Sequence, residues 1–142
     1  MGLVEIASSK SVWRAIDYYQ SKKVLSWNKT ETGYEGSVSG SDNNTYIVNV
    51  DIEHPRKSKC TCPFATDHRV ICKHMLAVYF SAHPEEVRRI EKEAEEYEKE
   101  EEYREQMRKE QLYDYVRMLS KEELRDELVE ALYELEYYRR RW

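Results

Sequence analysis

Apolar and polar residues alternate over residues 45–52, which is the pattern of a strand with one buried face. That face would carry four apolar residues: Tyr46, Val48, Val50 and Ile52. Two shorter apolar segments, residues 24–28 and 34–39, precede it. The turns between the three segments, at 29–33 and 40–44, contain Gly, Asp or Asn, which tolerate positive φ angles. Three consecutive strands joined by short turns predict an antiparallel meander.

The apolar face of such a sheet needs a cover, and the pattern predicts two helices that can supply it. The first helix, over residues 9–21, would present one apolar stripe: Val12, Ala15, Ile16 and Tyr19. Either Ser9 or Ser11 stands in position to cap its N-terminus. The second is a short apolar helix over residues 74–82, which has to end before Pro84. Sheet and helices together predict a small α+β domain.

The chain after Pro84 follows a helical pattern. Proline followed by two acidic residues is typical of a helix start. An apolar seam begins at Val87, fades over residues 98–106, and returns after Met107. The fading stretch offers almost no apolar side chains, so we expect it to be the least protected part of the helix.

A second helix is predicted to begin at Ser120, because Ser120 to Glu123 form a capping box. Its apolar stripe has six members: Leu124, Leu128, Ala131, Leu132, Leu135 and Tyr138. Two joined helices of this kind predict a hairpin, a helical dimer or a docking arm. Because the stripe needs burial, we expect a homodimer through residues 107–142.

Charge divides the 142-residue chain into two parts. The net charge is −5, but residues 1–84 carry ten Lys and Arg against eight Asp and Glu, a balance of +2, whereas residues 85–142 carry a balance of −7. We therefore predict a first domain over 1–84 and an all-α helical arm over 85–142. No apolar run approaches the roughly 20 residues of a membrane span, and the N-terminus is too short and acidic for a secretion signal, so we expect a cytoplasmic location.

All three cysteines of the chain and His74 lie within 15 residues. The four are Cys60, Cys62, Cys72 and His74. Three thiolates and an imidazole form a tetrahedral donor set that suits one structural Zn²⁺ per chain. A C-x-C pair in extended chain can point both sulfurs to one side. Positions i and i+2 diverge within a helix, so Cys72 is expected just outside the 74–82 helix, with His74 in its first turn.

Two other uses of the cysteines fit the sequence less well. A disulfide between Cys60 and Cys62 would leave Cys72 unpaired, and thiols inside a cell stay reduced. A CDGSH-type iron–sulfur site has a C-x-C pair followed by C-x-x-x-H, whereas Cys72 here is followed directly by Lys73-His74. The zinc interpretation is therefore preferred, and His68, inside the ligand loop, is the only credible substitute for His74.

The pattern Cys60-x-Cys62…Cys72-x-His74, continued by Met75-Leu76-Ala77, resembles the SWIM zinc finger. The resemblance extends upstream to residues 36–41 and 46–48 and covers roughly residues 10–82. It implies a small ββα zinc module for nucleic-acid or protein binding, of a kind found beside helicase-like ATPases, in Mutator-type transposases and in recombination mediators. The C-x-H-x-x-A run that ends at Ala77 is similar to mediators that pair with RecA-class recombinase paralogues.

Basic residues flank the predicted metal site. The candidate nucleic-acid contacts are Arg56, Lys57, Lys59, Arg69 and Lys73, and three further lysines are candidates to join them: Lys22, Lys23 and Lys29. The alternative is an ordinary solvated face, diluted by acidic neighbours. Phe64 would either stack on a base or pack against the metal loop, and packing is the favoured interpretation.

No catalytic constellation is evident in the sequence. A zinc ion with four protein ligands has no open position for water or substrate, and a phosphate-cradling glycine loop is missing from a chain with four glycines. We therefore expect a non-enzymatic protein of one of two kinds. The first is a DNA-binding protein, and the second is an interaction adaptor, for example a mediator with a recombinase or helicase-type partner.

Overall fold

The computed structural model describes residues 2–66 and 68–142. The chain divides into two units, Met1–Lys92 and Glu93–Trp142, and each is described by itself. Within the described residues, every helix is too short or too polar to cross a membrane.

The first unit is built on a four-stranded antiparallel sheet in the order β1-β2-β3-β4. The strands are β1 (Val24–Lys29), β2 (Gly33–Ser39), β3 (Thr45–Asp51) and β4 (Lys59–Cys60). β2 and β3 pair along their whole length, from Gly33 opposite Asp51 to Ser39 opposite Thr45. Two residues in the turn before β3, Asp42 and Asn43, have positive φ angles, as the predicted turn chemistry requires.

The sequence pattern predicts three strands, whereas the sheet has four. The additional strand, β4, is only two residues long. It pairs Cys60 with Val48 and Lys59 with Asn49. A two-residue strand has no alternation to detect, so its pairing arises from the long-range contact with β3 rather than from a local pattern.

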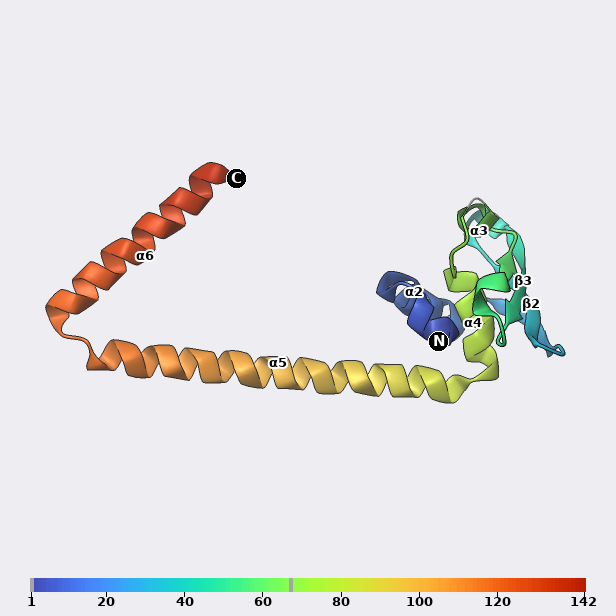
Figure 1. The fold of residues 1–142 in the computed structure, drawn as a ribbon, viewed down its shortest axis with the longest axis horizontal. Helices are drawn as coiled ribbons and strands as arrows, with labels where there is room; N and C mark the ends of the chain where they lie inside the picture. The colour runs from blue at the N-terminus through green and yellow to red at the C-terminus, as the bar shows by residue number, and fades with distance from the viewer. Residues whose placement is uncertain (1, 67) are drawn as a thin grey trace. The chain divides into compact units, whose positions relative to one another are not determined.

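The described residues form six helices: α1 (Leu3–Ile6), α2 (Ser9–Gln20), α3 (Pro63–Thr66), α4 (Lys73–Ala82), α5 (Pro84–Met118) and α6 (Lys121–Arg141). Two segments form short 3₁₀ helices, η1 (Ser41–Asn43) and η2 (Pro55–Lys57). α4 packs on the sheet against β1, β2 and β3, and α2 packs on α4, so that α4 lies between α2 and the sheet (Figure 1).

The core lies between these layers and is closed by the metal-loop residues. Its fully buried side chains come mainly from the alternating face of β3 and from α4, with Val48, Val50, Leu76 and Phe80 all 0% exposed. Val12, Ala15 and Ile16 of α2 are buried too, which confirms the predicted stripe of that helix. Because α4 contacts both the sheet and α2, it is apolar almost all around.

The N-terminus of α2 differs from the prediction. Ser8, rather than Ser9 or Ser11, is the N-cap, and its Oγ accepts a hydrogen bond from the Ser11 backbone N–H at 3.1 Å. Ser9 and Ser11 are already helical. The short helix α1, which buries Leu3, was not predicted, because four residues are too few to show a helical period.

A hydrogen-bonded cluster marks the junction between α4 and α5. His83, the C-cap of α4, lies between the Tyr34 hydroxyl on β2, 2.7 Å from its Nε2, and the Glu85 carboxylate, 3.0 Å from its Nδ1. Val87 on the first turn of α5 is buried as well. The start of α5 is therefore part of the first unit.

The second unit consists of the rest of α5 and α6. Ser120 caps α6 in the predicted capping box, with Glu123 N–H donating to Ser120 Oγ and Ser120 N–H donating to Glu123, both at 3.2 Å. No residue of α6 is buried, and its leucines are widely exposed, for example Leu128 at 59% and Leu135 at 60%.

Candidate metal centre and basic groove

The four predicted ligands converge from three segments of the fold. Cys60 ends β4, Cys62 directly precedes α3, and Cys72 is the N-cap of α4, with His74 in that helix's first turn. All four residues are buried, at 1–6% exposure. Their ligand atoms all lie within 4.8 Å of one another.

The distances fit a tetrahedral ion. The Cys60 and Cys72 sulfurs each lie 3.8 Å from His74 Nδ1. With Zn–S near 2.3 Å and Zn–N near 2.0–2.1 Å, tetrahedral angles separate a sulfur from a nitrogen ligand by about 3.6 Å and two sulfurs by about 3.8 Å. The observed spacing therefore leaves room for a zinc ion, with Nδ1 as the histidine donor.

Backbone N–H groups point at the sulfurs. Cys62 N–H donates to the Cys60 sulfur at 3.5 Å, and Ala65 N–H donates to the Cys62 sulfur at 3.4 Å. Cys72 receives a hydrogen bond from the Met75 backbone at the start of α4. These donors stabilise thiolates in a buried place, and the positive end of the α4 dipole acts in the same direction.

Without a metal, the thiols would have to share protons. The hydrogen bond between Cys60 and Cys72 raises the pKa of Cys60 and lowers the pKa of Cys72 to about 4, and burial raises the pKa of Cys62. A divalent cation replaces these protons and compensates the charge of the thiolates, since cysteine binds a metal as the thiolate. The donor set fits structural zinc.

The second nitrogen of His74 completes the fit. With Nδ1 on the metal, Nε2 carries the proton; it is buried and has no hydrogen-bond partner among the described residues. The imidazole lies against the Tyr18 and Tyr46 rings, at centroid distances of 5.4 and 4.8 Å. Aromatic packing rather than a carboxylate thus holds the ring in place.

Thr61, between the first two ligands, ties the metal loop to β3. Its N–H donates to the Ile47 carbonyl at 3.1 Å, and its Oγ1 accepts from the Ile47 N–H at 3.0 Å. The role of Thr61 was not predicted. In the sequence, only its place between two ligands hints at it, because a hydroxyl there can accept a backbone hydrogen bond in place of a neighbouring strand.

Beside the metal lies a groove of about 890 Å³, called here the basic groove. Its lining includes four of the five predicted nucleic-acid contacts: Arg56, Lys57, Lys59 and Arg69. All four are exposed, and none forms an ion pair with a described carboxylate. One wall comes from η2 and β4, and the other comes from the loop between Cys62 and Cys72, so the metal joins the two walls. Asp67, on that loop, lies outside the described residues.

The fifth candidate, Lys73, is placed elsewhere. Its Nζ lies 4.7 Å from the centre of the Tyr18 ring, which Lys23 also approaches at 4.6 Å. These two lysines form cation–π contacts on α2 rather than lining the basic groove. Lys22 and Lys29 do not line it either.

Phe64 does not pack against the metal loop as predicted. It is 55% exposed, and its ring makes a T-shaped contact with His68, with the ring centroids 6.2 Å apart. The residues of this loop that belong to the buried core are Cys62, Ile71 and Cys72, and Phe64 is not among them. His68 itself is exposed and stands outside the ligand cluster.

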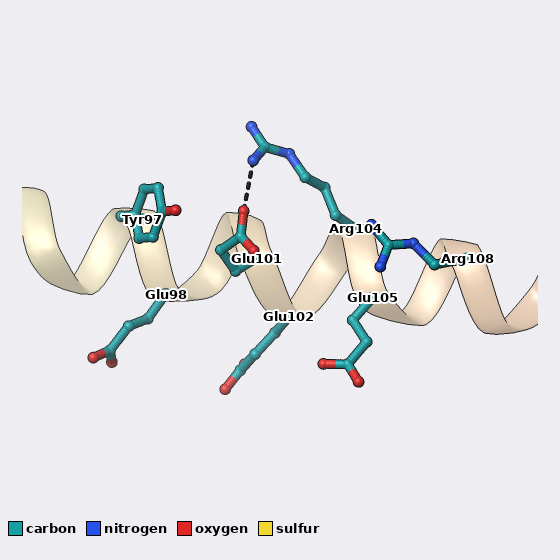
Figure 2. A pocket seen from close by; sticks show the side chains of 7 residues that line it. All are labelled: Tyr97, Glu98, Glu101, Glu102, Arg104, Glu105 and Arg108. Carbon is teal, nitrogen blue, oxygen red and sulfur yellow. Dashed lines mark hydrogen bonds and ion pairs between the residues drawn. The ribbon is translucent and has the colours of Figure 1, made fainter. Parts of the chain in front are cut away.

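A further hollow of about 330 Å³ lies on α5, lined by Tyr97, Glu98, Glu101, Glu102, Arg104, Glu105 and Arg108. Figure 2 shows that these side chains all project from a single helix, with Arg104 donating to Glu101 at 2.7 Å. A space between side chains of one exposed helix does not enclose a ligand. Its ion pairs are those expected of a solvated acidic helix.

Comparison with known proteins agrees with this geometry. Residues 46–83 match the family model of the SWIM zinc finger, a span that contains all four ligands, all of α4 and all of β3 except Thr45. No match was found among curated proteins or among solved structures. This segment of the chain is therefore similar to the SWIM zinc finger in both its sequence and the grouping of its four ligands.

Proposed function

We propose that this SWIM zinc finger binds DNA without catalysing a reaction, and that the zinc ion holds the basic groove in shape. The observation that supports the proposal is the grouping of four exposed cations, free of ion pairs with described carboxylates, beside the metal. Unpaired Arg and Lys side chains in a concave surface are the usual footprint of phosphate binding.

The zinc ion has a structural role in this proposal. Four protein ligands fill the tetrahedral shell, so no position is left at which zinc could activate water. Because Arg69 stands on the ligand loop and Lys59 stands next to Cys60, loss of the metal would separate the two walls of the basic groove. DNA binding is therefore expected to depend on zinc.

The test uses the full chain, loaded with zinc, and labelled DNA of mixed sequence in a retardation or anisotropy assay. Changing Arg56, Lys57 and Lys59 together to Ala should weaken binding and flatten the slope of log K against log salt by up to about three contacts. Binding should depend little on DNA sequence, because contacts to phosphates carry no sequence information.

A charge-matched control separates the effect of the groove residues on DNA binding from the effect of the protein's net charge. Changing Lys92, Lys99 and Lys109 on α5 to Ala removes the same number of positive charges from residues that do not line the basic groove and should leave the salt slope unchanged. If the zinc-loaded chain retards neither single- nor double-stranded DNA at low salt, the DNA proposal is wrong for the free protein.

In that case the adaptor function takes its place. The exposed apolar stripe of α6 favours contact with protein. The buried Ala77 on α4 has a packing reason of its own, since it is 0% exposed beneath the sheet, so it adds little support for a recombinase-type partner.

A further inference from the structure

A second hollow, of about 310 Å³, adjoins the basic groove. Its lining is of two kinds, apolar and polar: Ile6, Ala7, Ser8, Ser11, Arg56, Phe64, Arg69, Val70 and Ile71. Three of these residues, Arg56, Arg69 and Val70, also line the basic groove. The two spaces therefore share a wall that contains both arginines, and a chain lying in the groove can reach into the hollow.

Phe64 is the aromatic residue among the described residues that line the hollow, and it does not line the basic groove. Its ring is more than half exposed, although the loop that carries it is anchored by Cys62 and the Ala65 N–H bond to that sulfur. An exposed ring that shares a hollow with two guanidinium groups is the arrangement on which single-stranded nucleic acids stack their bases.

The opposite rim of the hollow is polar. Ser8 and Ser11 at the start of α2 bring two hydroxyl groups to it, 2.9 Å from each other. Hydroxyl groups can donate or accept hydrogen bonds, so they suit the edge of any base without selecting one. The hollow thus combines an aromatic face, a polar rim and cations at its entrance.

We propose that this hollow receives an unpaired base of single-stranded DNA, stacked on Phe64, while the adjacent phosphates lie on Arg56 and Arg69. The inference rests on the proposed function and narrows it to single strands. In a duplex the faces of a base are covered by its neighbours and only its edges are accessible, so a protein ring stacks on a base that has left the helix. The volume of the hollow lies at the lower end of the roughly 300–1,000 Å³ that is usual for ligand pockets, which suits a single base.

The experiment measures anisotropy of the zinc-loaded full chain with three labelled probes of about 12 nucleotides, a length within the site sizes of single-strand binders. The probes are a single strand, the same sequence as a duplex, and the same strand with abasic sites at its central positions. The wild type should bind the single strand several-fold more tightly than the other two.

Phe64→Leu keeps apolar bulk but removes the ring. It should weaken single-strand binding about five- to 100-fold, the range for loss of one base–aromatic stack, and leave the duplex and the abasic strand within twofold. Phe64→Tyr should restore binding, and Trp13→Leu, which removes another exposed ring on α2, should have no effect.

The outcomes separate the two proposals. Equal affinity for single strand and duplex, unchanged by Phe64→Leu, overturns the base-stacking site and leaves DNA binding by the basic groove intact. Equal losses on all three probes, with zinc content and circular dichroism unchanged, also overturn it, because Phe64 would then only support the loop. Absence of binding to every probe overturns the proposed function itself.

Discussion

The backbone of Cys72 explains how two ligands separated by one residue reach the same ion. Cys72 has extended angles, φ −86° and ψ 165°, and α4 begins at the next residue. The change from extended to helical backbone between Cys72 and His74 turns both side chains toward Cys60. A helix start also supplies the Met75 N–H to the Cys72 sulfur, so one structural feature positions the ligands and stabilises their charge.

The first prediction concerns this site. Purified protein should contain about one zinc per chain, and Cys72→Ser or His74→Ala should release it and unfold the first unit, because structural zinc contributes on the order of 10 kcal/mol to folding in small domains. Elemental analysis and circular dichroism measure the two effects. His68→Ala, in the same loop but outside the cluster, is the control and should retain the metal.

Two results would contradict it. Protein purified without zinc that still shows a fully folded spectrum would mean that the core is sufficient alone. A visible iron–sulfur absorption band would mean that the donor set holds a cluster.

The ligands were predictable from sequence because their chemistry is local: four donor residues at a characteristic spacing need little knowledge of the fold. The exposure of Phe64 was not predictable, because it depends on which residues of the loop pack into the core, and these are Cys62, Ile71 and Cys72. The separation of Lys73 from the other cations was equally hidden. Its direction depends on the packing of α2 against α4, which brings Tyr18 beside it.

At the scale of elements, those with a repeated pattern or a capping signal were predicted, and those held by contacts alone were not. β3 and α2 appeared where their apolar periods placed them, and α6 begins at its capping box. β4 is too short to have a period. β1 contains a register shift between Val24 and Ser26 that leaves Leu25 58% exposed, and such a bulge has no signal in the sequence.

The second prediction concerns the middle of α5. Over residues 98–106 every side chain is exposed, and the ion pairs of Arg104 with Glu100 and Glu101 lie in solvent, where they add little. Helix propensity alone then holds the segment. We expect it to be the most labile helical stretch, with the fastest amide hydrogen exchange and the first proteolytic cuts.

Residues 75–78 of α4, at 0–1% exposure, provide the internal reference and should exchange slowest. If residues 98–106 proved as protected as α4, a partner helix would have to cover them in solution.

At the scale of the whole molecule, two units of opposite character are joined in one chain. The first has a compact core and the basic groove, whereas the second is acidic overall and has widely exposed leucines. Monomeric proteins rarely expose an apolar stripe of this kind to water. We propose that a second copy of the chain covers it. The exposed stripe residues of α6, Leu128, Leu132, Leu135 and Tyr138, each leave roughly 100 Å² uncovered, which gives about 400 Å² per copy, about half of the roughly 800 Å² per partner that a specific interface buries.

Charge complementarity supports a second copy in antiparallel orientation. α6 carries Glu122 and Glu123 in its first turn and three arginines in its last turn, Arg139 to Arg141. Antiparallel pairing of two α6 helices places each acidic end against a basic end and opposes the two helix dipoles. The seam between the ends follows 4-3-4-3 spacing through Leu124, Leu128, Ala131, Leu135 and Tyr138, and Leu132 belongs to it as well, one turn after Leu128 on the same face.

The last prediction tests this pairing by light scattering at micromolar concentration. The wild type should have twice the 17.1 kDa of one chain, and Leu128→Asp with Leu132→Asp should produce monomers, because two carboxylates would be buried in the seam. The matched control, Val129→Asp with Tyr133→Asp, adds the same charges at the same spacing off the seam and should leave the dimer intact. Exchanging Arg139 to Arg141 for Glu should weaken the dimer, and changing Glu122 and Glu123 to Lys in the same chain should restore it. A wild type with the mass of one chain would instead mean that α6 folds back on α5 as a hairpin.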